Sequence, residues 1–131
     1  MPCANFHKRF VDPILGGSKV HTVRAGKRVH KVGQILSMQT GFRYHPQPFA
    51  QHVIIRVRPI TITDVTVMVW REDLSGCIVP HLDKFANADG FKDWADLKEF
   101  FLRMHGEKSA HGFWFFNVQG RLVQWAPAEW D

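Results

Sequence analysis

The chain has 131 residues, of which 45% are hydrophobic and 22% charged, and this composition argues against a disordered chain. No apolar run approaches the ~20 residues of a membrane span, and the opening MPCANFHKRF carries no apolar signal stretch. Two distant cysteines without a CxxC pattern predict neither a disulfide framework nor a zinc site. We therefore expect a single cytoplasmic domain over residues 1–131, with no membrane partner.

Charge is distributed unevenly along the chain. The formal net charge is +5, yet residues 1–60 hold ten Lys or Arg and one acid, whereas residues 61–131 hold seven Lys or Arg and eleven acids. Such asymmetry indicates a basic face for a polyanion such as nucleic acid. The alternative is that the two halves interleave in space and their fields average out.

The first predicted element is a short helix. Apolar residues recur every four positions at Phe6, Phe10 and Ile14, which predicts a helix around Arg9–Leu15. The two glycines that follow are typical of a helix end, because glycine adopts the left-handed conformation at low cost. Val20–Arg24 is then predicted as a short strand or an extended turn.

Strands are predicted for the middle of the chain. The segment GQILSMQTG (33–41) reads as a strand bounded by glycines, and TITDVTVMVW (61–70) as one or two strands rich in β-branched residues. Between them HVIIRVRPI (52–60) also predicts a strand. Its alternation places Arg56 and Arg58 on the same face.

A long helix and a hairpin are predicted for the last third of the chain. Asp93 is typical of a helix N-cap, and an apolar stripe that ends at Met104 predicts a helix as far as about His105. The segments 113–118 and 122–126 flank the tripeptide QGR and predict a closing hairpin. This order predicts an α+β fold with a small, mostly antiparallel sheet that curls toward a barrel flanked by helices.

The stretch GGSKVHTVR (16–24) is the first candidate site. A partly buried Lys19 loses proton affinity and can act as a base, and Thr22 can then serve as a nucleophile. Arg24 offers a cationic fork for a phosphate or a carboxylate. We expect His21 to alternate with Lys19 and to face elsewhere. The alternative for the whole stretch is a solvated basic turn.

Two further motifs could contribute to a site. In TGFR (40–43), Gly41 lets the backbone approach a ligand, Phe42 can stack on a base, and Arg43 sits at the mouth of the sheet. In ADGF (88–91), Asp89 is a candidate general acid or base. A plain glycine turn and a turn or capping aspartate are the respective alternatives.

The sequence contains a basic loop that suits nucleic acid, and it lacks the patterns typical of metal or cofactor sites. The run RAGKRVHK (24–31) contains Lys27 and Arg28, and such a run suits a phosphate backbone, whereas its alternative role is to solubilise a loop. The eight histidines form no HxH, HxxxH or HExxH pattern, so we expect no metal. No Gly-rich phosphate loop or nucleophile elbow is present, and we expect no cofactor.

These motifs together resemble a known family. The segments FHKRFVDPILGGSKVHTVRAGKRVHKVGQILSMQTGFR and FANADGFKDWADLKEFFLRMHG, followed by FWFFNVQGRLVQW, resemble the ASCH domain of the PUA-like superfamily, and most closely its small phage and prophage members. The likeness covers roughly residues 5–125, and the pattern GxKxxTxR falls on residues 17–24. It implies a small β-barrel flanked by helices, with a cleft beside this turn that binds RNA or modified bases.

The resemblance also implies specific activities. Some ASCH members deacylate N4-acetylcytidine with a lysine, a threonine and a carboxylate, which fall here on Lys19, Thr22 and Asp89, with Asp in place of the expected Glu. We therefore expect a protein that binds RNA, single-stranded nucleic acid or a modified nucleoside. The alternatives are a metal-independent amidohydrolase on an N4-acylcytidine-type nucleoside, a ribonuclease, and a protein-interaction module. The oligomeric state stays open.

Overall fold

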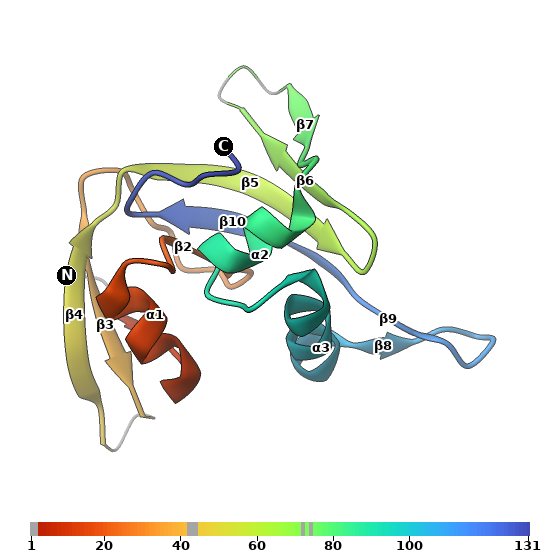
Figure 1. Cartoon of the computed structure of the whole chain (residues 1–131), viewed down its shortest axis with the longest axis horizontal. Coiled ribbons are helices and arrows are strands. Elements are labelled where there is room, and N and C mark those ends of the chain that lie inside the picture. The colour runs from red at the N-terminus through yellow and green to blue at the C-terminus, as the bar shows by residue number, and fades with distance from the viewer. Residues whose placement is uncertain (1–2, 42–44, 72, 74) are drawn as a thin grey trace.

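The computed structural model describes residues 3–41, 45–71, 73 and 75–131, and Figure 1 shows their arrangement. The elements follow one another as β1 (Cys3–Asn5), the 3-10 helix η1 (Lys8–Phe10), α1 (Val11–Gly16), β2 (His21–Arg24), β3 (Ile35–Thr40), β4 (Gln47–Val53), β5 (Arg56–Thr63), β6 (Val67–Trp70), β7 (Gly76–Ile78), α2 (Leu82–Ala88), α3 (Trp94–His105), β8 (Glu107–Lys108), β9 (Trp114–Phe115) and β10 (Asn117–Gln124).

The described strands pair in three separate sheets. A five-stranded sheet has the order β2-β10-β5-β6-β7 and is antiparallel throughout. A three-stranded sheet has the order β1-β3-β4, in which β1 runs parallel to β3. The short β8-β9 ladder projects from the body, and the three-stranded sheet lies across one end of the five-stranded sheet (Figure 1). The predicted α+β class, mostly antiparallel, is confirmed.

Both predicted helices form where local signals place them. The first appears as η1 followed directly by α1, and Gly17 ends α1 in the left-handed conformation with φ 87°. Asp93 caps α3, since its carboxylate accepts a hydrogen bond from the Asp96 backbone N–H at 2.8 Å. Leu97 and Phe101 bury the apolar stripe of α3, whereas Met104 is about half exposed.

The predicted closing hairpin is wrong, because its expected turn at residues 119–121 lies within the single strand β10, while Trp114–Phe115 form the separate strand β9. This strand lies in the middle of the sheet and pairs with both β2 and β5. Gly120 is not a turn residue there: a Cβ on it would lie 2.5 Å from the Arg24 carbonyl oxygen. The glycine is required by the close approach of two strands, which a sequence reading mistakes for a turn.

The predicted strand over residues 52–60 is in fact divided between two sheets. β4 ends at Val53 and β5 begins at Arg56. The backbone N–H of Ile54 donates to Gln34 beside β3, while that of Ile55 donates to Gln124 in β10. Two consecutive residues therefore bond to different sheets, and the chain crosses between them at this point.

Helix α2 was not predicted. Its buried residues include Phe85 and Ala86, which with Leu82 have the i, i+3, i+4 spacing of a helix face. The helix has only seven residues, so this pattern covers less than two full repeats. The helix matters for the candidate site because Asp89 is its C-cap residue.

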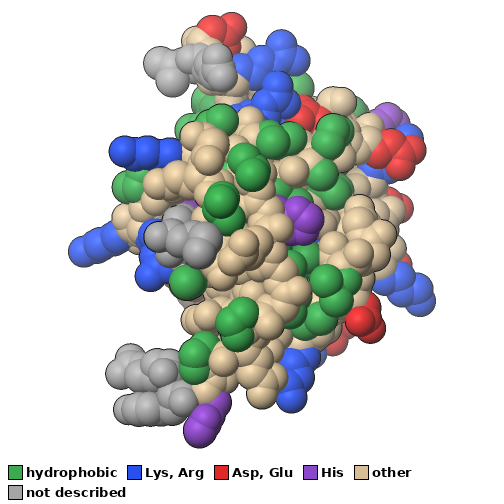
Figure 2. All heavy atoms as spheres, turned by 90° about the vertical axis from the view of Figure 1, so that its left-hand side faces the viewer, with side chains coloured by type: hydrophobic (Ala, Val, Ile, Leu, Met, Phe, Trp, Pro, Cys, Tyr) green, Lys and Arg blue, Asp and Glu red, His purple; other side chains and the backbone are tan. Residues whose placement is uncertain are grey.

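Most of the buried apolar side chains form one cluster, and both larger sheets and all the described helices contribute to it. Figure 2 views the molecule from the side of β4 and shows apolar side chains dispersed over this face, with Lys and Arg side chains mainly at its margins. Within the described residues, no helix is long and apolar enough to cross a membrane.

We predict that Gly120→Ala lowers the free energy of unfolding by about 1–3 kcal/mol, because the added methyl group forces β10 away from β2. Urea denaturation measures this change. Gly26→Ala is the matched control, since no neighbouring atom lies within 4 Å of where its Cβ would be. Equal denaturation midpoints for the two variants would show that the close approach is not a constraint.

Candidate functional site

The predicted motifs meet where the chain leaves α1 and passes the end of α2. The backbone N–H of Lys19 donates to the Pro13 carbonyl at 3.0 Å, and that of Val20 donates to the Ala88 carbonyl at 2.8 Å. These two bonds place the residues before β2 directly against the residue that caps α2. The GxKxxTxR and ADGF motifs, seventy residues apart in sequence, therefore share one location.

Lys19 and Asp89 form a buried ion pair. The Lys19 ammonium donates to the His21 carbonyl at 2.9 Å and to the Asp89 carbonyl, and its Nζ lies 3.4 Å from Asp89 Oδ1. The lysine is only 2% exposed. Gly90 makes room for it, because a Cβ there would lie 2.7 Å from Lys19 Cδ. All three ammonium donors thus have acceptors inside the protein.

His21 belongs to this cluster, so the expectation that it faces elsewhere is wrong. Its Nδ1 lies 2.9 Å from Asp89 Oδ1, and the Trp130 indole N–H donates to its Nε2 at 2.9 Å. An indole nitrogen can only donate, so Nε2 accepts and Nδ1 carries the proton of a neutral imidazole. Residues two apart share a face of a strand, so alternation gave no reason to turn His21 away from Lys19. β2 itself begins only at His21.

Burial shapes the protonation of the cluster. Desolvation lowers the pKa of Lys19 to about 8, although the Asp89 carboxylate opposes this effect. Desolvation also lowers the pKa of His21, against the same carboxylate. Near neutral pH the cluster therefore holds a neutral imidazole and a lysine that is still mostly protonated but loses its proton at a lower pH than a surface lysine does.

A cleft of about 890 Å³ lies on the other side of the motif, and we call it the basic cleft. Thr22 and Arg24 line it, whereas Lys19, His21 and Asp89 do not. It is lined by Cys3, Ala4, Asn5, Phe6, His7, Lys8, Phe10, Thr22, Val23, Arg24, Ala25, Gly26, Arg28, His30, Gly41, Phe100, Met104, His105 and Val118. No carboxylate is among these lining residues, while three Lys or Arg and three His are.

Two phenylalanines separate the cluster from the basic cleft. Phe6 and Phe10 line the cleft, and the Lys19 ammonium lies 5.8 Å and 4.6 Å from their ring centroids. Within the described residues, no hydrogen bond joins the Thr22 hydroxyl to Lys19 or Asp89. The structure thus brings together the predicted lysine and carboxylate, and leaves the predicted threonine on the cleft side.

The cationic wall of the cleft holds polar atoms that lack protein partners. The Arg24 guanidinium lies 4.6 Å from the Phe6 ring centroid and donates to the Asn5 carbonyl at 3.0 Å, yet its Nε is buried without a partner in the described chain. His30 is 6% exposed, and its Nδ1 is likewise unpartnered among described atoms. Desolvation, Arg24 and Arg28 lower the pKa of His30, so its imidazole is neutral near pH 7.

Of the remaining predicted site residues, some line the basic cleft and others do not. Arg28 lines the cleft and donates to the Cys3 carbonyl, and Gly41 also lines it. Lys27 is exposed and is not among the lining residues. Phe42 and Arg43 lie outside the described residues.

Sequence reasoning missed part of the cleft. His7 and Phe100 pack edge to face with ring centroids 5.1 Å apart, and both line the cleft together with His105. These residues come from the η1 and α3 regions, so only the tertiary structure brings them together. The half-exposed Met104 belongs to the same wall, which explains why the end of the predicted apolar stripe is not buried.

Comparisons with known proteins leave the assignment to the chemistry of the chain itself. No family model, no curated protein and no solved structure matches the chain. Among the residues that the structure describes, no group of three or more His, Cys, Asp or Glu side chains is placed to hold a metal ion. The ASCH resemblance consequently rests on its motifs, and the function is argued from the geometry of the basic cleft.

We predict that the Lys19 pair makes stability depend on pH above neutrality. The folded-state pKa of Lys19 is about 8 and its ordinary value is 10.5, so between these values the unfolded chain binds more protons. The free energy of unfolding therefore rises with pH across this window, by about 3 kcal/mol in total. Urea denaturation from pH 7 to pH 10.5 measures the rise.

Lys19→Met provides the comparison for this prediction, because it removes the titrating group and leaves every surface group in place. The variant should be less stable than the parent at pH 7, since Asp89 then lacks its cation. Its stability should lack the rise between pH 8 and pH 10.5. Parallel pH profiles for the two proteins would mean that Lys19 titrates normally.

Proposed function

We propose that this chain is a nucleotide- or RNA-binding protein of the PUA-like type, and that the basic cleft is its binding site. The observation that carries the proposal is the lining of the cleft, which combines cations and aromatic rings without a carboxylate among its described residues. Nucleic acid needs this combination, because phosphates require cations and bases require flat apolar faces.

The arginines suit the phosphate groups of such a ligand. Arg28 and Lys8 are exposed at the cleft, and Arg24 offers a guanidinium whose Nε has no partner among the described residues. A guanidinium presents several donors in a fixed plane, which match the oxygens of a phosphate. The backbone carbonyls that Arg24 and Arg28 contact hold these side chains in place before the ligand arrives.

The aromatic and imidazole groups suit a base. His7 and Phe100 present ring surfaces at the cleft, and the buried Nδ1 of neutral His30 is available to donate or accept a hydrogen bond. Single-stranded RNA recognition relies on such stacking together with hydrogen bonds to base edges.

In line with the ASCH resemblance, we also propose that the two larger sheets correspond to the PUA-like barrel, with β4 leading directly into β5.

We predict that Lys8→Gln combined with Arg28→Gln weakens binding of single-stranded RNA at least tenfold at low salt. The slope of log affinity against log salt concentration should become shallower by about 1.4, because two phosphate contacts on a single strand are lost. Fluorescence anisotropy at several salt concentrations measures both quantities.

The matched control is Lys84→Gln combined with Lys92→Gln, which removes the same charge from exposed positions outside the cleft. This control should change affinity by less than about twofold. Equal losses in the two double variants would indicate a general charge effect and would contradict a site in the cleft.

A second candidate function is hydrolysis of an N-acylated nucleoside, and one observation favours it. Burial lowers the pKa of Lys19 to about 8 beside Asp89, which gives a lysine suited to proton transfer near neutral pH. Thr22 lies within the basic cleft, where an acyl group would bind. For the two to cooperate, the Phe6 and Phe10 side chains must move aside, because they lie between Lys19 and the cleft.

We predict that, if this second function holds, Lys19→Met abolishes release of acetate from N4-acetylcytidine, while Lys84→Met retains full turnover. The activity of the parent should rise as pH increases toward 8, as Lys19 loses its proton. Chromatographic detection of cytidine measures turnover, and circular dichroism shows that the variants are folded. Absence of turnover by the parent protein, with RNA binding intact, would leave binding as the function.

A further inference from the structure

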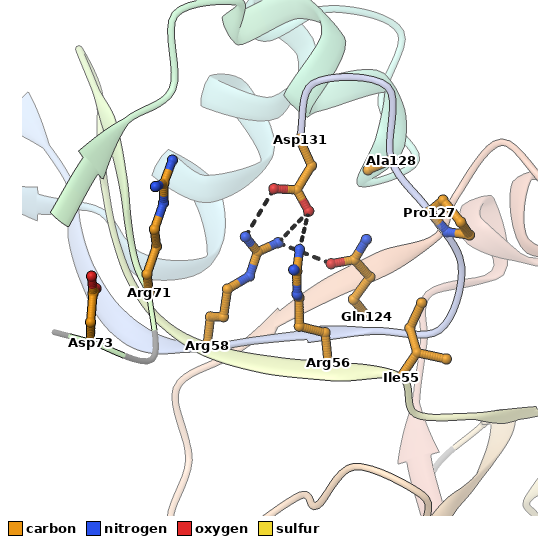
Figure 3. Close-up of a pocket in the computed structure, with 9 residues that line it drawn as sticks. All are labelled: Ile55, Arg56, Arg58, Arg71, Asp73, Gln124, Pro127, Ala128 and Asp131. Carbon is orange, nitrogen blue, oxygen red and sulfur yellow. Dashed lines mark hydrogen bonds and ion pairs between the residues drawn. The ribbon is translucent and has the colours of Figure 1, made fainter. Parts of the chain in front are cut away.

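A second pocket lies apart from the basic cleft, and none of its described lining residues also lines the cleft. We call it the arginine pocket. It has a volume of about 920 Å³ and is lined by Ile55, Arg56, Arg58, Arg71, Asp73, Gln124, Pro127, Ala128 and Asp131. Figure 3 shows its arginines rising from the five-stranded sheet, and the segment after β10 lying over them.

Two arginines of β5 converge on one carboxylate in this pocket. The Arg58 nitrogens Nη1 and Nη2 donate to the two oxygens of Asp131 at 3.0 Å and 2.8 Å, and Arg56 Nη1 donates to Oδ2 at 2.7 Å (Figure 3). This contact is a bidentate fork with a second cation added. It confirms that Arg56 and Arg58 share a face of the strand, as the alternation of the sequence predicts.

Arg58 is held rigidly before any ligand binds. It is 8% exposed, its Nη2 donates to Gln124 Oε1 at 3.0 Å, and its guanidinium lies 5.3 Å from the Trp130 ring centroid. Its Nε is buried and has no partner in the described part of the chain. A fixed and partly unsatisfied guanidinium is what an oxyanion site requires, since little side-chain freedom is lost on binding.

Arg71 adds a third cation. Figure 3 shows its side chain rising alongside Arg58 from the end of β6. Within residues 3–41, 45–71, 73 and 75–131, its guanidinium makes no hydrogen bond or ion pair. Asp131 satisfies Arg56 and Arg58, whereas Arg71 interacts electrostatically with the exposed Asp73 and keeps its guanidinium donors for a ligand with more oxygens.

We propose that Arg56, Arg58 and Arg71 form a binding site for a phosphate group, and that the Asp131 carboxylate takes the position of that phosphate in the structure described here. A carboxylate carries one charge and two oxygens, whereas a phosphate monoester carries up to two charges and three free oxygens. We expect the larger group to contact Arg71 as well as Arg56 and Arg58, since all three line the pocket. Asp131 therefore acts as an internal competitor that keeps phosphate affinity low.

Displacement of Asp131 would be felt in the buried cluster. Trp130 precedes it, contacts Arg58 and donates its indole N–H to His21 Nε2. When phosphate displaces the carboxylate, this indole changes its surroundings. The indole N–H of Trp130 is consequently a spectroscopic reporter of the site.

The test measures binding of inorganic phosphate to the parent protein and to Asp131→Asn by calorimetry at constant ionic strength. The variant should bind about tenfold more tightly, because a competitor that occupies the site nine-tenths of the time raises the apparent dissociation constant tenfold. Glu129→Gln is the matched control, since it removes the same charge from the same segment at an exposed residue that pairs with Lys84. The control should bind as the parent does.

Further variants assign the site. Arg56 is half exposed, so this position should tolerate substitution. Arg56→Gln combined with Asp131→Asn should abolish the gain in phosphate affinity that Asp131→Asn alone produces. Arg28→Gln, in the basic cleft, should leave this gain in phosphate affinity unchanged. Phosphate titration of Asp131→Asn should shift the NMR signal of the Trp130 indole N–H, which Arg56→Gln should prevent.

Three outcomes would overturn the proposal. The first is equal affinity in the Asp131→Asn and Glu129→Gln variants. The second is loss of phosphate binding in Arg28→Gln with retention in Arg56→Gln, which would place the phosphate in the basic cleft. The third is binding only at concentrations where sulfate and chloride bind equally well, which would indicate a general attraction of anions.

Discussion

The buried ion pair between Lys19 and Asp89 is the interaction on which the other features of the structure depend. It joins the end of α2 to the start of β2. Among the described residues, the ammonium bonds only to His21 and Asp89. Loss of either partner would leave a charge in the protein interior, which costs far more than the loss of a surface pair. His21 and Trp130 extend the same network to the segment after β10. The first, middle and last parts of the chain are thus joined by one hydrogen-bonded network, in which Asp89 contacts Lys19 and His21, and His21 contacts Trp130.

The sequence predicted correctly those features that depend on residues close together in the chain. The cap at Asp93 and the common face of Arg56 and Arg58 follow from helical and strand periodicity, which act over a few residues. The role of Gly120 could not be predicted in this way, because it depends on how closely another strand approaches. The same holds for His21, whose partners are 68 and 109 residues away. Family likeness suggested the lysine and carboxylate of the cluster, and only the fold shows that aromatic rings separate them from the cleft.

The uneven charge of the sequence is expressed in two places rather than on one face. Lys8, Arg24 and Arg28 line the basic cleft, while Arg56 and Arg58 belong to the arginine pocket. The cleft has no carboxylate among its described lining residues, whereas the pocket has two, Asp73 and Asp131, and Asp131 already holds Arg56 and Arg58. Similar cationic groups therefore differ in availability. The cleft is open to an anion at once, whereas the pocket must first give up an internal one.

The central position of β10 has a consequence for the order of folding. β2 pairs with β10 alone among the described strands, and its residues lie about a hundred positions earlier in the chain. During synthesis β2 and β5 emerge long before the strand that joins them. The five-stranded sheet can close only after residue 124 has left the ribosome, so the unpaired edges of β2 and β5 are exposed until then. Because β3 and β4 are adjacent in sequence, we expect them to pair before the five-stranded sheet closes.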